Sequence, residues 1–143
     1  RALAEKDRKL RELAAELTAV QERARRAASR EVERQRRALY ADLLELADDL
    51  DRALGASGAG SGVSEGVALV RDRLLDKLTA YGVARIEALG ERFDPKRHEA
   101  QALVPVEDAA RDGLVVDVYR QGYAIGADVL RPAGVAVGRA AKA

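Results

Sequence analysis

The sequence predicts an α+β protein in which a long N-terminal helix and a short helix precede a small all-β head domain. Residues 1–54 contain neither proline nor glycine, and the segment GASGAGSG follows at 55–62. Beyond Gly82 apolar residues recur at every second position, which is the period of a strand. We therefore expect a paired-helix rod over residues 1–38, a helical hairpin over residues 39–82 with a flexible linker at 55–62, and a compact β head over residues 83–143.

The rod is predicted to be one continuous helix, because strong helix formers dominate residues 1–54. At the rise of an α-helix it would span about 80 Å, too long for the core of a small globule, so its apolar stripe predicts a second chain. Heptad spacing from Leu3 to Ala27 indicates a two-stranded coiled coil. An eleven-residue spacing fits the longer run from Leu10 to Leu54 better and predicts paired helices that are nearly straight or slightly right-handed. The rod positions that we assign to the dimer interface are Leu10, Leu13, Leu17 and Val20.

The apolar stripe widens after residue 38 and becomes too broad for one partner helix. Ser64 is a suitable N-cap for a second helix and Gly82 is a stop signal, so we expect this helix to fold back along residues 39–54. One such hairpin has too little core, whereas two would form a four-helix bundle, which predicts a homodimer. The bundle positions that we assign to the dimer interface are Leu39, Leu43, Leu46, Leu50, Val70 and Leu74.

Alternating apolar residues after Gly82 predict an antiparallel head. Asp112 and Gly113 are a turn signal between two of its strands. Gly122 indicates a bulge or bend, and Pro132 is expected to restrict the last strand to an edge or a bulged position, because proline lacks the N–H that a sheet requires.

Composition and charge exclude several classes of protein. Lys and Arg total 25 and Asp and Glu 24, so no global field attracts nucleic acid or a membrane surface. The chain has no cysteine, which excludes disulfides and thiolate metal sites, and no apolar run approaches the ~18 residues of a membrane helix. We expect a cytoplasmic protein without a membrane partner, and a sequence without a starting Met is expected to be a fragment.

Catalytic chemistry has little support in the sequence. Residues 83–143 contain no Ser, Thr or Cys, so the head lacks hydroxyl and thiol nucleophiles. Asp94, His98 and Glu99 are a conceivable metal set, but a lone imidazole beside two carboxylates on a turn is more often structural. We expect no enzymatic activity, no cofactor and no metal, and a turn starting at Asp94 and Pro95 that His98 holds by hydrogen bonding.

A basic stretch within the rod offers an alternative function. A coiled coil could bind nucleic acid through Arg23–Arg37, where arginines are frequent. Glu22, Glu31 and Glu33 interrupt the run, and a solvated face with intrahelical ion pairs explains it better. We therefore do not expect a nucleic-acid partner.

Three strings carry a resemblance to a known family when they occur in this order. FDPKRHEA at 93–100, the pair Gly122-Tyr123 and LRPAGVAV at 130–137 resemble the β-domain of GrpE, the nucleotide exchange factor of DnaK-type chaperones. Upstream, LLELADDLDRAL at 43–54 and GVARIEALGERFDP at 82–95 are similar to the segments that precede that domain. The resemblance covers roughly residues 39 to 137.

This resemblance implies a homodimer that binds the ATPase domain of a DnaK-type chaperone and promotes ADP release, with long helices that melt on heating. It also implies contact residues, each of which has a structural alternative. Phe93, Tyr119 and Val137 could be core, Pro95 a turn residue, Arg131 a solvated charge and Gly66 a poor helix former tolerated near a frayed helix end. The candidate chaperone-binding residues are Gly66, Phe93, Pro95, Tyr119, Arg131 and Val137.

Overall fold

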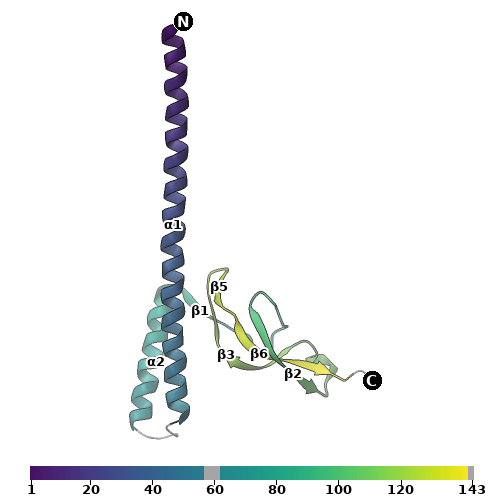
Figure 1. The fold of residues 1–143 in the computed structure, drawn as a ribbon. Coiled ribbons are helices and arrows are strands. Elements are labelled where there is room, and N and C mark those ends of the chain that lie inside the picture. The colour runs from purple at the N-terminus through teal and green to yellow at the C-terminus, as the bar shows by residue number, and fades with distance from the viewer. Residues whose placement is uncertain (57–61, 142–143) are drawn as a thin grey trace. The chain divides into compact units, whose positions relative to one another are not determined.

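The computed structural model describes residues 1–56 and 62–141. This part of the chain holds two α-helices followed by six strands and a short 3-10 helix, which confirms the α+β fold class (Figure 1). The chain divides into two compact units, Arg1–Leu39 and Tyr40–Ala143. The elements in chain order are α1 (Ala2–Ala56), α2 (Gly62–Ala80), β1 (Val83–Ile86), β2 (His98–Val106), η1 (Ala109–Arg111), β3 (Val115–Arg120), β4 (Gly122–Ile125), β5 (Asp128–Arg131) and β6 (Ala133–Ala140).

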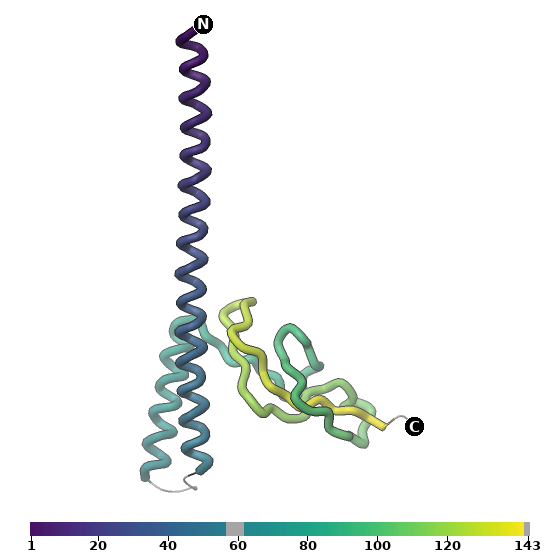
Figure 2. Tube along the Cα trace, viewed as in Figure 1, coloured from purple at the N-terminus to yellow at the C-terminus, as the bar shows by residue number. Residues whose placement is uncertain are grey.

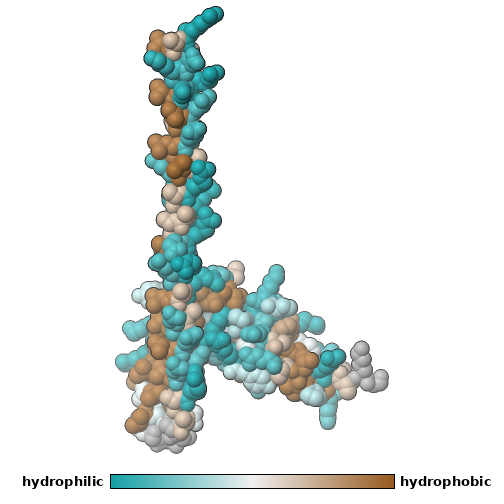
Figure 3. Space-filling view, viewed as in Figure 1, coloured by the Kyte–Doolittle hydropathy of each residue, from teal (hydrophilic) through white to brown (hydrophobic). Residues whose placement is uncertain are grey.

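The first unit is the N-terminal part of α1, which runs without interruption and confirms the predicted continuous helix. Nearly all of its side chains are exposed. Leu10, Leu13 and Leu17 keep more than half of their surface in contact with solvent. Figure 3 shows apolar side chains at intervals along this helix among hydrophilic ones. In a single chain, the side chains at the heptad positions therefore remain exposed to solvent.

The second unit begins with a helical hairpin. Here α2 lies antiparallel beside the C-terminal part of α1 (Figures 1 and 2). Tyr40 and Leu44 from α1 and Leu78 from α2 form one buried cluster with Val83 and Tyr123 from the strands. The hairpin and the sheet that contains β1 therefore share one hydrophobic core.

The two ends of α2 differ in how well the sequence predicted them. Gly82 has a φ of 95°, and its N–H donates at 2.9 Å to the carbonyl of Thr79, which confirms the glycine stop. Ser64 is not the N-cap, because α2 already begins at Gly62 and Ser64 is buried inside the helix. Glycine is itself acceptable at a helix start. Of the predicted linker at 55–62, Gly55 and Ala56 belong to α1 and Gly62 to α2, and residues 57–61 lie outside the described residues.

The head consists of two three-stranded sheets, with strand orders β1-β4-β5 and β2-β6-β3. The expectation of an antiparallel head is wrong for one pair, because β2 runs parallel to β6. The turn signal at Asp112 and Gly113 also does not join paired strands, since β6 lies between β2 and β3. The connection from β2 to β3, which includes η1 and this turn, instead crosses the C-terminal end of β6. The N–H of Gly113 donates to the carbonyl of Gly138 at 2.9 Å, and a Cβ at Gly138 would lie 2.5 Å from the carbonyl oxygen of Arg111.

Pro132 stands between β5 and β6, where the chain passes from one sheet to the other. The expectation that it restricts the last strand to an edge or a bulged position is wrong, because the proline precedes β6 and leaves every N–H of that strand available. The strand therefore lies at the centre of its sheet. Its side chains supply most of a second buried cluster, which consists of Ala88, Val115, Ala133, Val135 and Val137 with Phe93 and Val118 packed against it.

Candidate functional site

The loop between β1 and β2 is fixed by backbone hydrogen bonds around Asp94. The N–H of Asp94 donates to Nδ1 of His98 at 3.0 Å, and the N–H of His98 donates to the carbonyl of Asp94 at 2.8 Å. The carboxylate of Asp94 also accepts the N–H of Lys96 at 3.0 Å, as an Asx turn does. These contacts confirm that His98 holds the loop. Because Nδ1 accepts a hydrogen bond, the imidazole is neutral with its proton on Nε2.

Two of the candidate contact residues, Phe93 and Pro95, lie in this loop. Pro95 is exposed, whereas Phe93 is half-buried with its ring centroid 5.9 Å from that of His98. The N–H of Phe93 donates to the carbonyl of Gly113 at 2.9 Å. This hydrogen bond connects the loop to the segment that leads into β3. Val137 is 7% exposed and belongs to the cluster against which Phe93 packs. Phe93 and Val137 therefore belong to the same apolar core, whereas Pro95, two residues after Phe93, lies on the surface.

Tyr119 lies on β3, and 53% of its surface is exposed. It lines a groove of about 1050 Å³ between the head and the C-terminal part of α1. A bulge in β2 places Gln101 on the same groove, where its amide covers Gly134. The wall formed by α1 is acidic. Its acidic residues are Glu45, Asp48, Asp49 and Asp51.

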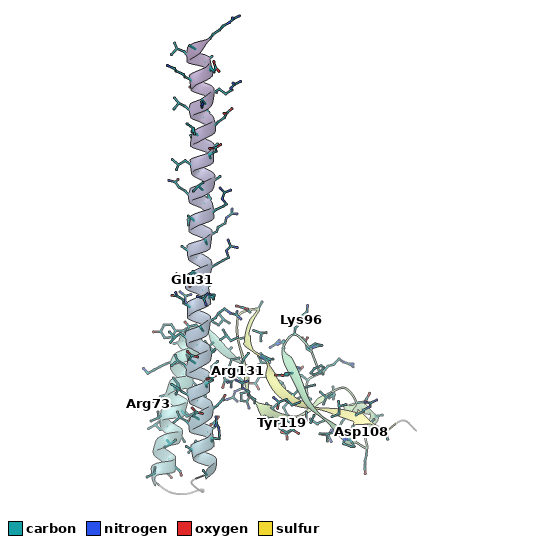
Figure 4. The ribbon with its side chains drawn as sticks, viewed as in Figure 1. Glu31, Arg73, Lys96, Asp108, Tyr119 and Arg131 are labelled. Carbon is teal, nitrogen blue, oxygen red and sulfur yellow. The ribbon has the colours of Figure 1, made fainter. Side chains whose placement is uncertain are left out.

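Arg131, at the end of β5, is 7% exposed and connects the head to α1 (Figure 4). Its Nη1 and Nη2 donate to the two carboxylate oxygens of Asp48 on α1 at 2.6 and 2.8 Å. Its Nε donates to the carbonyl of Gln121 at 2.8 Å, and its guanidinium carbon lies 5.4 Å from the ring centroid of Tyr123. Arg131 is therefore a buried link between the helical hairpin and the sheets.

The remaining predicted residues lie on the helices. Gly66 is exposed on α2, and a Cβ there would meet nothing within 4 Å. In the bundle part of the predicted dimer interface, Leu39, Leu46 and Val70 are more than half exposed. The others, Leu43, Leu50 and Leu74, are partly buried. The hairpin thus keeps an apolar surface in addition to the one that it buries against the head.

The basic stretch of the rod is largely paired within the helix. Arg34 donates to both carboxylate oxygens of Glu31, and this hydrogen bond lowers the pKa of Glu31 and raises that of Arg34. Arg25 pairs with Glu22 at 3.0 Å. Arg36 pairs with Glu33 at 3.1 Å. The three glutamates that interrupt the stretch therefore each neutralise a neighbouring arginine.

Sequence analysis did not identify Asp48 as a partner of Arg131. A signal was present, because Tyr40, Leu44 and Asp48 follow one another at i,i+4 spacing and so share one face of α1. The first two are buried, and a carboxylate in line with buried residues requires a cation or hydrogen-bond donors. The sequence separation of 83 residues concealed which cation this is.

Two further observations concern the part of the chain that the structure describes. Residues 1–56 and 62–141 contain no group of three or more His, Cys, Asp or Glu side chains that could hold a metal ion. Within the same ranges, neither helix combines the length and the apolar character needed to cross a bilayer.

Comparison with known proteins identifies the family. The sequence model of the GrpE family matches residues 2–139. The chain belongs to the GrpE family. Protein GrpE of Lactiplantibacillus plantarum is 36% identical over 135 residues, which cover 92% of this chain and 68% of that protein. Protein GrpE of Thermus thermophilus is 41% identical over 97 residues, which cover 67% and 52% of the two chains. For protein GrpE of Brachyspira hyodysenteriae the identity is 37% over 117 residues, covering 78% and 58%. The chain thus spans between half and about two thirds of the length of these GrpE relatives.

Proposed function

We propose that this chain is a nucleotide exchange factor that binds the ATPase domain of a DnaK-type chaperone and promotes release of ADP. The observation that carries the proposal is the match to the GrpE family over residues 2–139. The described residues add a head with an exposed loop that hydrogen bonds between Asp94 and His98 hold in place, which suits a protein that acts by binding. Such a factor makes and breaks no covalent bond and requires no cofactor, and we place it in the cytoplasm.

The proposed contact surface combines the exposed residues of the head with α2. The loop contributes exposed Pro95 and half-buried Phe93, and β3 contributes Tyr119. Gly66 contributes helix backbone that no side chain covers. Arg131 and Val137 are buried, so in this proposal they hold the surface in place and do not form its outer face.

Exchange follows from preferential binding. If the surface fits the ATPase domain better when the nucleotide cleft is open, the factor shifts the population of that domain toward the open state and lowers its affinity for ADP. Linkage then requires that nucleotide weaken the binding of the factor by the same ratio, so ATP entry helps to release it.

We further propose that the active form is a homodimer, paired along the rod and through a four-helix bundle. The support is the row of exposed apolar residues on α1 and on α2. A helix with a long exposed apolar stripe is stable in water when a second helix covers that stripe. The division into a rod over residues 1–38, a hairpin over residues 39–82 and a head over residues 83–143 is part of this proposal.

The deciding experiment is the release of fluorescently labelled ADP from a purified DnaK-type chaperone, followed by stopped flow. The rate should rise with the concentration of this protein and saturate, while the protein alone hydrolyses no ATP. Rates that stay constant at saturating protein would remove the proposed function.

Phe93→Ala tests the loop, and Leu89→Ala is its matched control. Both change a large apolar residue of the head, but Leu89 is 67% exposed and is not part of the proposed surface. Phe93→Ala should lower the exchange rate with the strand signals intact, whereas Leu89→Ala should leave the rate unchanged. Unfolding of the head in Phe93→Ala would instead assign Phe93 to the core alone.

A further inference from the structure

We propose that Asp48 and Arg131 are positioning residues, which fix the orientation of the β head relative to the helical hairpin. Their salt bridge joins the part of α1 that belongs to the second unit to the end of β5, across 83 residues of sequence. The second test below rests on the proposed function. In that function, the pair holds the loop at Phe93 and the surface of α2 in the relative positions that allow both to contact the chaperone at once.

The geometry of Arg131 distinguishes this contact from a surface ion pair. All three nitrogens of the guanidinium are used, with Nη1 and Nη2 on the two oxygens of Asp48 and Nε on the carbonyl of Gln121. A planar two-pronged pair of this kind sets an angle as well as a distance. The Arg131 side chain is 8% exposed and that of Asp48 is 29% exposed, so the arginine end of the pair is shielded from water.

The surroundings of the pair explain why orientation depends on it. Gln121 lies between β3 and β4, and Tyr123, beneath the guanidinium, belongs to the sheet of β1 and to the core of the hairpin. Arg131 therefore contacts the junction of both sheets, and its charge is paired with Asp48 of α1. Arg120 lies 3.8 Å from the same carboxylate, but it is 45% exposed and adds a weaker attraction.

The first test measures orientation without any partner. The chain has no cysteine, so spin labels can be attached only at Arg73→Cys on α2 and Lys96→Cys on the loop, both exposed positions (Figure 4). Labelled chains would be diluted with an excess of unlabelled chain so that only distances within one chain are recorded.

A single narrow distance distribution is expected for the otherwise unchanged chain. Arg131→Gln and Asp48→Asn should broaden or split it, and the double variant should be no worse than either single one, because both remove the same interaction. Arg71→Gln is the matched control, since Arg71 pairs with Asp51 at 2.8 Å and this ion pair joins α2 to α1. Distributions that are unchanged in Arg131→Gln, or broadened equally in Arg71→Gln, would overturn the proposal.

The second test asks whether orientation matters for exchange. The affinity of the factor would be measured for the nucleotide-free and for the ADP-bound chaperone. Loss of the pair should reduce the ratio of these affinities about tenfold, equivalent to about 1.4 kcal/mol, and leave binding to the ADP-bound form within about twofold. Arg131→Lys, which keeps the charge and the stem, should lie between the wild type and Arg131→Gln, and it replaces that variant if the glutamine prevents folding.

The outcomes separate the two proposals. If the wild-type chain fails to accelerate ADP release, the proposed function is wrong, and the spin-label distances still decide whether the pair fixes the head. If exchange is normal in the wild type and the affinity ratio is unchanged in Arg131→Lys and Asp48→Asn, the positioning role is wrong.

Discussion

The N–H of Asp94 and Nδ1 of His98 lie 3.0 Å apart, and the N–H of His98 returns to the carbonyl of Asp94. A single residue pair thus closes the loop that carries Phe93 and Pro95. The closure depends on a neutral imidazole, because a protonated Nδ1 is a donor and would face the donor N–H of Asp94.

Acidification should therefore destabilise the head. Burial lowers the pKa of His98 below its ordinary value of 6.5, although the charge of Asp94 opposes this shift. Above that value the imidazole is neutral in both the folded and the unfolded chain. As the pH falls below 6.5, the unfolded chain binds a proton that the folded chain does not, so the free energy of unfolding decreases until the pH reaches the lowered pKa. Denaturant unfolding between about pH 7.5 and about pH 5 measures this effect.

The control for this prediction is His98→Gln, which retains an acceptor for the N–H of Asp94 but does not titrate. As the pH falls over the same range, the free energy of unfolding of the wild type should decrease more than that of His98→Gln. Parallel curves would show that His98 is not the cause of the acid sensitivity.

A side chain at Gly122 should not be tolerated. A Cβ at this position would lie 2.4 Å from the backbone nitrogen of Ala133, an atom of the central strand that cannot rotate away. We expect Gly122→Ala to lower the free energy of unfolding by about 1–3 kcal/mol, as overpacking does. Urea titrations monitored by circular dichroism would measure the loss.

Gly66→Ala is the matched control for the same substitution. Gly66 lies within α2 with no atom near its missing Cβ, so alanine should stabilise the helix by up to about 1 kcal/mol. Equal destabilisation by both substitutions would contradict the close contact at Gly122. A more stable Gly66→Ala protein with slower exchange would support a partner contact at α2.

A charge on the bundle surface should prevent association more strongly than a charge near the helix start. Leu46 is 53% exposed in one chain and Leu3 is 84% exposed, and only the first would be enclosed by four packed helices in the proposed dimer. We expect Leu46→Lys to weaken the dimer at micromolar concentration, because burying an unpaired charge is costly, and Leu3→Lys to leave it intact. Sedimentation equilibrium distinguishes these outcomes. A wild-type monomer at that concentration would remove the dimer proposal.

Heating should melt the rod before the head. Gln21, Arg25, Glu31 and Gln35 lie on or beside the predicted seam, so residues 10–38 would bury little apolar surface per turn even when paired. Calorimetry should show an early reversible transition that coincides with loss of the helical signal, while signals from the strands persist, and exchange should fall with it. One cooperative transition by both probes would contradict this order.

The periodicity of the sequence predicted α1 and the glycine stop at Gly82 because those features depend on neighbours along the chain. It could not predict that β2 runs parallel to β6, since alternation of apolar residues is the same for either direction. Pro132 illustrates the same limit. Its missing N–H was recognised, but only the strand order shows that it separates β5 from β6 and does not interrupt a strand.

For the candidate site as well, the sequence predicted the local features but not the long-range contacts. The role of His98 followed from its position four residues after an Asp-Pro turn begins. The burial of Arg131 did not, because its partner Asp48 is 83 residues away in sequence and the residues next to Arg131 give no sign of that carboxylate. Pairings between distant charges require the fold, whereas turns require only a few consecutive residues.

The central position of β6 has a consequence for how the protein is made. β6 follows all other strands of the described head in chain order, yet it alone hydrogen-bonds to both β2 and β3. During synthesis β2 and β3 cannot form their sheet until residues 133–140 have left the ribosome. The helices α1 and α2 emerge earlier and can already pair. Nascent chains should therefore acquire their helices first, and the head should be the last part to become resistant to proteases.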